Sequence, residues 1–92
     1  MNLKIYIHNV PNFPVEGILF RDITPLLKNA EAFKYVIEEL GNHVIQTNAA
    51  LIAGIESRGF LFGTTIAHSL DLPFVPIRKA GKLPGAILSE EY

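Results

Sequence analysis

The 92-residue sequence contains no cysteine, so neither disulfide bridges nor thiolate metal sites are available to it. It also lacks an excess of either charge, because 8 lysines and arginines balance 9 aspartates and glutamates. No overall field therefore attracts nucleic acid or a membrane surface, and any anion site must be local. No apolar run approaches the roughly 18 residues of a membrane helix. The start MNLKIYIHNV has no signal-peptide pattern either, and we expect a cytoplasmic protein.

Histidines at zinc-ligand spacing are likewise missing, since the chain's three histidines stand at positions 8, 43 and 68. Apolar residues, in contrast, are abundant: they make up 49% of the chain. A domain of this size buries only about 60 to 65% of the surface that its unfolded chain exposes. We therefore expect part of the apolar surface to meet another subunit or a further segment of chain.

The N-terminal residues carry two conflicting patterns. Leu3, Ile5 and Ile7 alternate as in a strand, whereas helical spacing is followed by Leu3, Tyr6, Ile7 and Val10. We favour a short helix there. Residues 11–17 contain three breakers in seven positions, which predicts an ordered loop.

Two helices are predicted next. Thr24 before Pro25 suggests an N-cap and a single turn over residues 25–28. Asn29 is predicted to cap a longer helix, in which Gly41 either weakens the middle or marks the end. Its apolar stripe consists of Phe33, Val36, Ile37, Leu40 and Val44.

The centre of the chain predicts an α/β fold. Residues 49–55 form a continuous apolar run, which is typical of a strand covered on both faces in a parallel sheet. A helix is expected over residues 60–70 and a second strand over residues 74–77, where Pro76 favours an edge position. This β-α-β unit is followed by a Gly/Pro loop and by what starts as another strand. Two strands and one helix do not cover a parallel sheet, so we expect the fold to be cut short.

The polar sequence Glu56-Ser57-Arg58-Gly59 follows the first of these strands. Ligands bind at the carboxyl ends of parallel strands, so this position is a candidate anion site. Gly59 lets the backbone approach a ligand, Ser57 can cap the helix, and Arg58 offers a charged fork suited to phosphate. An ordinary capped helix start with a surface arginine remains equally open. For Glu56 an acid or metal role is one alternative, and a structural hydrogen-bonding role in the loop is favoured.

A basic cluster follows the second strand and contains Arg78, Lys79 and Lys82. Because neighbouring parallel strands end on the same side of a sheet, this loop and Arg58 are expected to face one anion. A solvated basic loop is the alternative, with equal odds on the sequence alone.

The segment GILFRD, residues 17–22, places an aromatic ring in an apolar patch after the breaker-rich loop. Such a ring can stack on a planar ligand while adjacent backbone groups read its polar edge. More often a patch of this kind pins its loop to the core, and the residues alone favour that role.

Three segments together resemble one family: FPVEGILFRDITPLL, IAGIESRGFLFG and PFVPIRKAGKLPG. In this order and spacing they are similar to adenine phosphoribosyltransferases of the type I phosphoribosyltransferase family. The GILFRDITP segment separates these from hypoxanthine, xanthine and orotate members. The resemblance implies a truncated type I fold, with a parallel β-α-β core, N-terminal helices and the start of a flexible β-hairpin. It divides residues 1–92 into a base-binding segment (1–28), a helix (29–48), the core (49–78), and the basic loop with the start of the hairpin (79–92).

The resemblance also implies roles for individual residues. Phe20 would stack on adenine, and the backbones of Leu19 and Arg21 would contact its polar edge. The pyrophosphate of phosphoribosyl pyrophosphate would be bound by Glu56, Ser57, Arg58, Gly59, Lys82 and Arg78, the last of which would reach it across a homodimer interface. The Glu56–Ser57 bond would be a cis peptide.

The implied reaction joins adenine N9 to the sugar, releases pyrophosphate and forms AMP. Mg²⁺ accompanies phosphoribosyl pyrophosphate, and the site's cations would stabilise charge growing on the leaving group. The sequence departs from the family at Val15-Glu16, where a residue followed by proline is usual. The family's catalytic glutamate, acidic pair and 5-phosphate turn are expected beyond Tyr92, so we expect no catalytic residue in this chain and no activity from it alone.

Two other functions stay open. One is a non-catalytic nucleobase-binding or interaction module from a truncated reading frame. The other is a purine-sensing regulator on the same fold, which is disfavoured because no basic helix-turn-helix pattern occurs.

Overall fold

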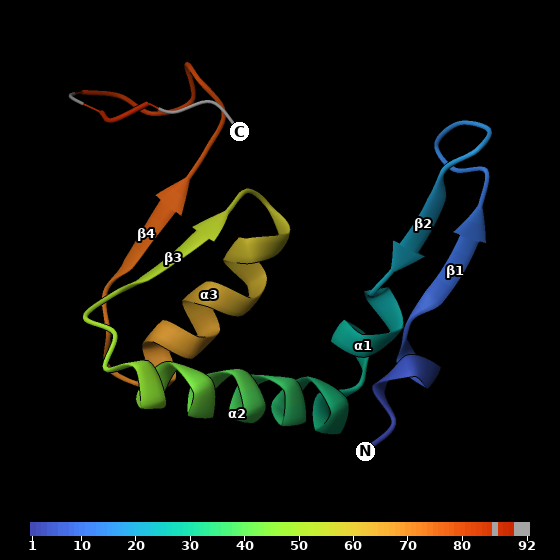
Figure 1. Ribbon diagram of the computed structural model, residues 1–92, viewed down its shortest axis with the longest axis horizontal. Helices are drawn as coiled ribbons and strands as arrows, with labels where there is room; N and C mark the ends of the chain where they lie inside the picture. The colour runs from blue at the N-terminus through green and yellow to red at the C-terminus, as the bar shows by residue number, and fades with distance from the viewer. Residues whose placement is uncertain (86, 90–92) are drawn as a thin grey trace. The chain divides into compact units, whose positions relative to one another are not determined.

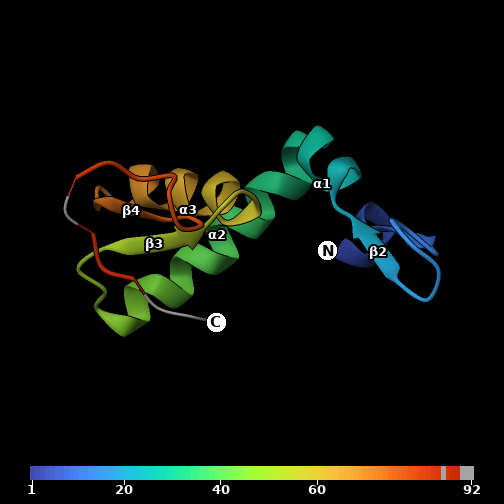
Figure 2. The same ribbon diagram turned by 90° about the horizontal axis from the view of Figure 1, so that it is seen from above.

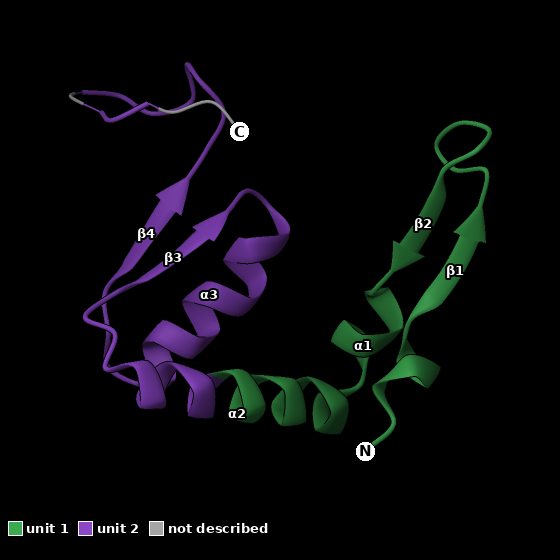
Figure 3. Ribbon diagram, in the orientation of Figure 1, with its two compact units in different colours: residues 1–40 green, residues 41–92 purple. Residues whose placement is uncertain are grey.

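The computed structural model describes residues 1–85 and 87–89 of the chain. Two compact units divide it, Met1–Leu40 and Gly41–Tyr92, and each is described by itself below (Figure 3). The boundary between them falls inside the long helix α2 (Ala30–Thr47).

Unit 1 opens with a 3₁₀ turn, η1 (Leu3–Tyr6), followed by a hairpin of β1 (His8–Pro11) and β2 (Leu19–Asp22) (Figure 1). The strands are antiparallel, and their register runs from His8 opposite Asp22 to Pro11 opposite Leu19. The predicted short helix is confirmed for η1 but is wrong from His8 onward. There the extended backbone gains a partner strand that local spacing does not reveal.

The hairpin loop is ordered, as its breakers predict. The Gly17 N–H donates to Asn12 Oδ1 at 3.0 Å, and the Phe13 N–H donates to the Ile18 carbonyl at 3.0 Å. The Phe13–Pro14 peptide is cis. The two hydrogen bonds give partners to polar groups that the turn would otherwise leave without one.

The two predicted helices of unit 1 are present as α1 (Thr24–Lys28) and α2. Thr24 is not the N-cap: it lies in the first turn, after Ile23. The Asp22 carboxylate instead accepts hydrogen bonds from both donors of Thr24. Its Oδ1 lies 2.9 Å from the Thr24 backbone nitrogen and 2.6 Å from Thr24 Oγ1. The Asn29 cap is confirmed, because its Oδ1 accepts from the Ala32 N–H at 2.9 Å.

Unit 2 contains the expected β-α-β order, with β3 (Ile52–Ile55), α3 (Arg58–Ser69) and β4 (Phe74–Ile77). The strands are parallel, from Ile52 opposite Phe74 to Ile55 opposite Ile77. β3 begins later than the apolar run because its first bond, from the Ile52 N–H to the Pro73 carbonyl, lies where the partner strand begins. Gly41 stays inside α2 and does not end it.

Helix α3 packs against β3, and the two views of the molecule agree on this placement (Figures 1 and 2). Close contact is possible because two glycines, Gly54 and Gly63, face the Phe74 ring without side chains of their own. Phe60 and Phe74 meet edge to face, with ring centroids 5.8 Å apart. Ile66 and Ala67 of the helix are buried here.

The opposite face of the β3–β4 pair is exposed. Alternation along the strands places Val75, Ile55 and Ile77 on this face, and they retain 43%, 48% and 40% of their accessible surface. The described part of the chain buries only four apolar side chains, Leu26, Ala32, Ile66 and Ala67. The abundance of apolar residues therefore produces apolar surface more than core.

Residues 87–89 are not strand in the structure, so the predicted start of another strand is not seen at these positions. Its remaining positions, 86 and 90–92, lie outside the described residues. Among the helices of the described chain, none combines the length and apolar character needed to cross a membrane.

Candidate functional site

The register of the parallel strands brings two loops together in unit 2. Ile55 and Ile77 are partners at the carboxyl ends of β3 and β4, and the Glu56 N–H continues the ladder by donating to the Ile77 carbonyl at 2.9 Å. Glu56 and Arg78 are therefore the first residues past neighbouring strand ends. This is the position at which open α/β sheets bind ligands.

Opposite charges meet at this point. Arg78 Nη2 donates to Glu56 Oε2 at 2.8 Å, and Lys82 Nζ lies 3.6 Å from Glu56 Oε1. A second guanidinium nitrogen, Arg78 Nη1, donates to the Lys82 carbonyl at 3.1 Å and so folds the loop back toward the strand end. The two loops therefore meet at Glu56, Arg78 and Lys82, whereas the prediction that Arg58 and the basic loop face one anion is not tested by these contacts.

The ion pair shifts the ionisation of both main partners. The hydrogen bond from Arg78 lowers the pKa of Glu56 below its ordinary value and outweighs the opposing effect of desolvation. The same hydrogen bond raises the pKa of Arg78. The Glu56 carboxylate therefore lies between two basic side chains, Arg78 and Lys82.

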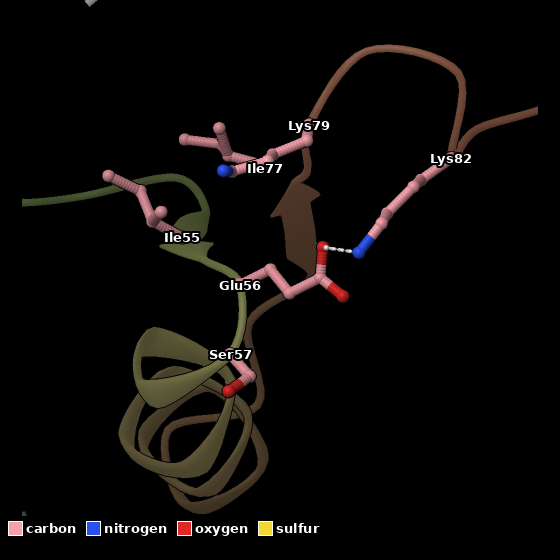
Figure 4. A pocket seen from close by; sticks show the side chains of 6 residues that line it. All are labelled: Ile55, Glu56, Ser57, Ile77, Lys79 and Lys82. Carbon is pink, nitrogen blue, oxygen red and sulfur yellow. Dashed lines mark ion pairs between the residues drawn. The ribbon is translucent and has the colours of Figure 1, made fainter. Parts of the chain in front are cut away.

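A cavity of about 290 Å³ opens beside the ion pair. Its lining consists of Ile55, Glu56, Ser57, Ile77, Lys79 and Lys82. Figure 4 shows the Glu56 carboxylate and the Lys82 ammonium pointing toward one another, while the Lys79 side chain extends away from that pair. The volume lies at the lower end of the range for small-molecule sites, roughly 300 to 1,000 Å³.

The turn from β3 into α3 confirms one expectation and contradicts another. The Glu56–Ser57 peptide is cis, which confirms the prediction. The Ser57 side chain makes no capping hydrogen bond, so that prediction is wrong. Its backbone lies in the right-handed helical region, at φ −110° and ψ −20°, where a typical N-cap residue is extended. Its carbonyl instead accepts from the Phe60 N–H at 3.0 Å.

Arg58 and Gly59 belong to the first turn of α3, because the helix starts two residues before the predicted residue 60. Arg58 is exposed and does not line the cavity described above. Neither ion pair of the described chain includes it. Its contact with a shared anion therefore stays a prediction.

The candidate base-binding residues lie in unit 1. Phe20 is half-buried, and its ring meets that of Phe13 edge to face, with centroids 5.3 Å apart. Leu19 and Arg21 are exposed on the other face of β2, as the alternation of the strand requires. The Phe13 contact ties the hairpin loop to the strand, so the ring does pin its loop, while its remaining surface stays accessible.

The structural hydrogen-bonding role favoured for Glu56 is confirmed, because its carboxylate accepts from Arg78. Its pairing with the cations of the basic loop was not predicted. One signal was available. Opposite charges stand at the same offset, one position after each of two apolar strands, and parallel neighbours align such positions. The pocket residues Ile55 and Ile77 carried no separate signal, since any strand end has such residues.

Among residues 1–85 and 87–89, no group of three or more histidine, aspartate or glutamate side chains is placed to hold a metal ion. The carboxylate of Glu56 is already paired with two cations. Mg²⁺ is commonly held by one or two carboxylates together with substrate phosphates, so its expected place beside phosphoribosyl pyrophosphate stays a prediction.

Comparisons with known proteins point in one direction. No protein-family model matches the chain. The adenine phosphoribosyltransferase of Gloeobacter violaceus is 54% identical over all 92 residues, which correspond to 54% of that protein. A crystal structure of adenine phosphoribosyltransferase from Thermoanaerobacter pseudethanolicus aligns with 98% of the chain and 54% of its own length, at a TM-score of 0.91 and 51% identity.

The enzyme from Saccharomyces cerevisiae, crystallised with adenine and an imino-altritol bisphosphate, aligns with 91% of the chain and 52% of its own length. Its TM-score is 0.83 and its identity 48%. The chain thus spans about half the length of the relatives it matches. Its α/β architecture corresponds to the N-terminal half of the type I phosphoribosyltransferase fold. In its sequence and its fold, the chain matches the N-terminal half of adenine phosphoribosyltransferases.

Proposed function

We propose that this chain supplies the nucleobase and diphosphate sides of a cytoplasmic adenine phosphoribosyltransferase active site. In that reaction adenine N9 bonds to the anomeric carbon of phosphoribosyl pyrophosphate, the bond from that carbon to pyrophosphate breaks, and AMP forms. The observation that carries the proposal is the cavity at the carboxyl ends of β3 and β4, with Arg78 and Lys82 beside it.

The charges around the cavity suit a diphosphate. Lys82 keeps half of its side-chain surface exposed, at 51%, and Lys79 lines the same cavity. Lysine ammonium groups bind phosphate oxygens as point charges, and arginine adds a planar fork. Cations held here stabilise the charge that grows on a departing pyrophosphate more than the charge already on the substrate, which is the condition for catalysis. Arg58, at the start of α3, is proposed as a further ligand.

Phe20 is the proposed stacking partner of adenine. Its ring is fixed by Phe13 but not enclosed, so one aromatic surface remains for a planar base. The flanking residues Leu19 and Arg21 present backbone groups along the same strand. Support comes from the Saccharomyces cerevisiae relative, whose structure contains adenine.

Binding by the 92-residue chain tests this proposal directly. Calorimetry with adenine and, separately, with inorganic pyrophosphate is expected to give saturable binding of both. The Phe20→Ala variant should lose adenine binding and keep pyrophosphate binding, and Lys82→Ala should do the reverse. The His43→Ala variant, altered at an exposed position of α2, is the control for both ligands. Binding of neither ligand by the unaltered chain would contradict the proposal.

Turnover tests the second part of the proposal, that the remaining half of the enzyme is needed. The chain is mixed with adenine, magnesium and phosphoribosyl pyrophosphate, with or without the C-terminal half of the Gloeobacter violaceus relative, and AMP is measured by chromatography. AMP is expected only in the complemented mixture. AMP from the chain alone would show that the missing half is dispensable.

A homodimer is also part of the proposal. The resemblance assigns Arg78 to a diphosphate held by the partner subunit, so in a dimer the Glu56 carboxylate would compete with the partner's diphosphate for Arg78 and with the chain's own diphosphate for Lys82. Sedimentation equilibrium of the chain, alone and with its complementing half, measures the association. A monomer in both samples would rule out this assignment of Arg78.

A further inference from the structure

The two cations beside the cavity already have an anion, and the chain itself provides it. Both oxygens of the Glu56 carboxylate face cations: Oε2 is 2.8 Å from Arg78 Nη2, and Oε1 is 3.6 Å from Lys82 Nζ. A phosphate group approaching the same cations has to share them with this carboxylate. Glu56 lines the cavity, so the competition takes place at the site and not at a distance.

The arrangement is only partly satisfied. Glu56 Oε1 and Arg78 Nε are buried, yet neither has a hydrogen-bond partner within the described chain. A buried polar atom without a partner is unfavourable, so this ion pair is less stable than a fully bonded one. A ligand oxygen that reaches Arg78 would supply a partner that the carboxylate does not.

The charge of the cavity follows from its lining. Lys79 and Lys82 contribute two positive charges and Glu56 one negative charge, which leaves a net charge of 2 − 1 = +1. Arg78 donates to Glu56 and to the Lys82 carbonyl, so its guanidinium is held by the protein. Removal of the single carboxylate would raise the net charge of the lining to +2.

We propose that Glu56 is an internal counter-anion, which holds Arg78 and Lys82 when no diphosphate is bound and opposes the binding of diphosphate to them. This inference rests on the proposed function, because it assumes that the cavity takes a diphosphate. Glu56 is thus a positioning residue whose negative charge weakens anion binding, while its hydrogen bond to Arg78 keeps the loop folded. Weaker binding of the anion also favours its release.

The Glu56→Gln variant separates these two effects. The glutamine carbonyl can still accept from Arg78, whereas the negative charge is lost. Repulsion between a unit charge and a nearby multiply charged anion at a solvent-exposed site predicts affinity for inorganic pyrophosphate about five- to tenfold higher than in the unaltered chain.

Titration calorimetry of the 92-residue chain with pyrophosphate makes the measurement, and circular dichroism checks that each variant is folded. The matched control is Glu39→Gln, which removes an exposed carboxylate that belongs to neither ion pair of the described chain. We expect tighter binding by Glu56→Gln and unchanged binding by Glu39→Gln. Equal or weaker binding by Glu56→Gln, with binding by the unaltered chain intact, would overturn the counter-anion role alone. Absence of binding by both proteins would overturn the proposed function as well.

A second measurement needs no variant. The pKa of the Glu56 carboxyl group is measured in the unaltered chain, with and without saturating pyrophosphate, by following the NMR chemical shift of its carboxyl carbon across a pH series. A displaced carboxylate loses its cations and gains an anionic neighbour, so its pKa is expected to rise when pyrophosphate is bound. A purely structural ion pair would keep the same pKa in both samples, and that result would refute the inference even if Glu56→Gln failed to fold.

Discussion

Gly54 of β3 and Gly59 of α3 are in backbone contact: a Cβ atom on Gly54 would lie 2.6 Å from the Gly59 carbonyl oxygen. A Cβ on Gly59 would in turn lie 3.1 Å from the Gly54 carbonyl carbon. The strand and the helix that frame the Glu56 turn therefore cross without side chains between them. This close crossing brings the start of α3 directly beside the strand end.

A methyl group at position 54 should force the two elements apart. We expect Gly54→Ala to lower the free energy of unfolding by about 1 to 3 kcal/mol, since the nearest contacted atoms belong to the Gly59 backbone and cannot move aside. Urea unfolding measures the change. The control is Gly41→Ala, where a Cβ meets no atom within 4 Å and the helix interior should gain about 0.5 to 1 kcal/mol. A Gly54→Ala chain as stable as the unaltered one would show that the crossing is not tight.

Gly63 makes a different contact, with a side chain. A Cβ there would lie 2.5 Å from Cε1 of Phe74. Gly63→Ala should destabilise unit 2 by about 1 to 3 kcal/mol in the natural background. In a Phe74→Leu background, Gly63→Ala should lower the free energy of unfolding by less, because the shorter side chain leaves room for the methyl group. Additive effects in this double-mutant cycle would contradict the contact.

The Asn29 side chain stabilises the start of α2 through its bond from the Ala32 N–H. Asn29→Ala should therefore cost about 0.5 to 2 kcal/mol and reduce the helical signal in circular dichroism. Asn42→Ala, at an exposed position inside the same helix, provides the comparison. It should be neutral or slightly stabilising, since alanine favours helix interiors. The same loss from both substitutions would argue against a specific cap.

The Glu56–Arg78 pair should make stability depend on acid pH. Arg78 holds the pKa of Glu56 below the ordinary glutamate value of 4.5. A carboxylate with a lowered folded-state pKa contributes stability above its unfolded pKa and loses it as the pH falls through the folded value. The Tm of the unaltered chain should exceed that of Glu56→Gln at neutral pH. The difference should shrink as the pH falls below 4.5 and vanish only below the lowered folded-state pKa of Glu56.

A thermal melt series across this range measures the effect, and the Arg78→Gln background is its control. Without the guanidinium, Glu56→Gln should change the Tm little at any pH. A Tm difference that persists in strong acid would mean that shape, and not charge, distinguishes the two side chains.

The sequence by itself determined the elements whose signals are local. The apolar run before Glu56, the breakers around Pro73 and the apolar residues 74–77 were enough to predict the β-α-β unit, and β4 has the predicted bounds. Asn29 was recognised as a cap for the same reason, because a cap involves neighbours three residues away. Short family-specific segments identified the family.

Only the tertiary structure decided what depends on contacts between distant residues. The β1–β2 hairpin was missed because each strand is four residues long and is stable only through its partner. The strand predicted over residues 49–55 begins only at Ile52, because its pairing with β4 starts there. The partner of Glu56 is the clearest example. Its charge is visible in the sequence, but the register that sets it against Arg78, 22 positions away, exists only in the folded sheet. Charge type is a local property, whereas charge pairing requires the strands to align.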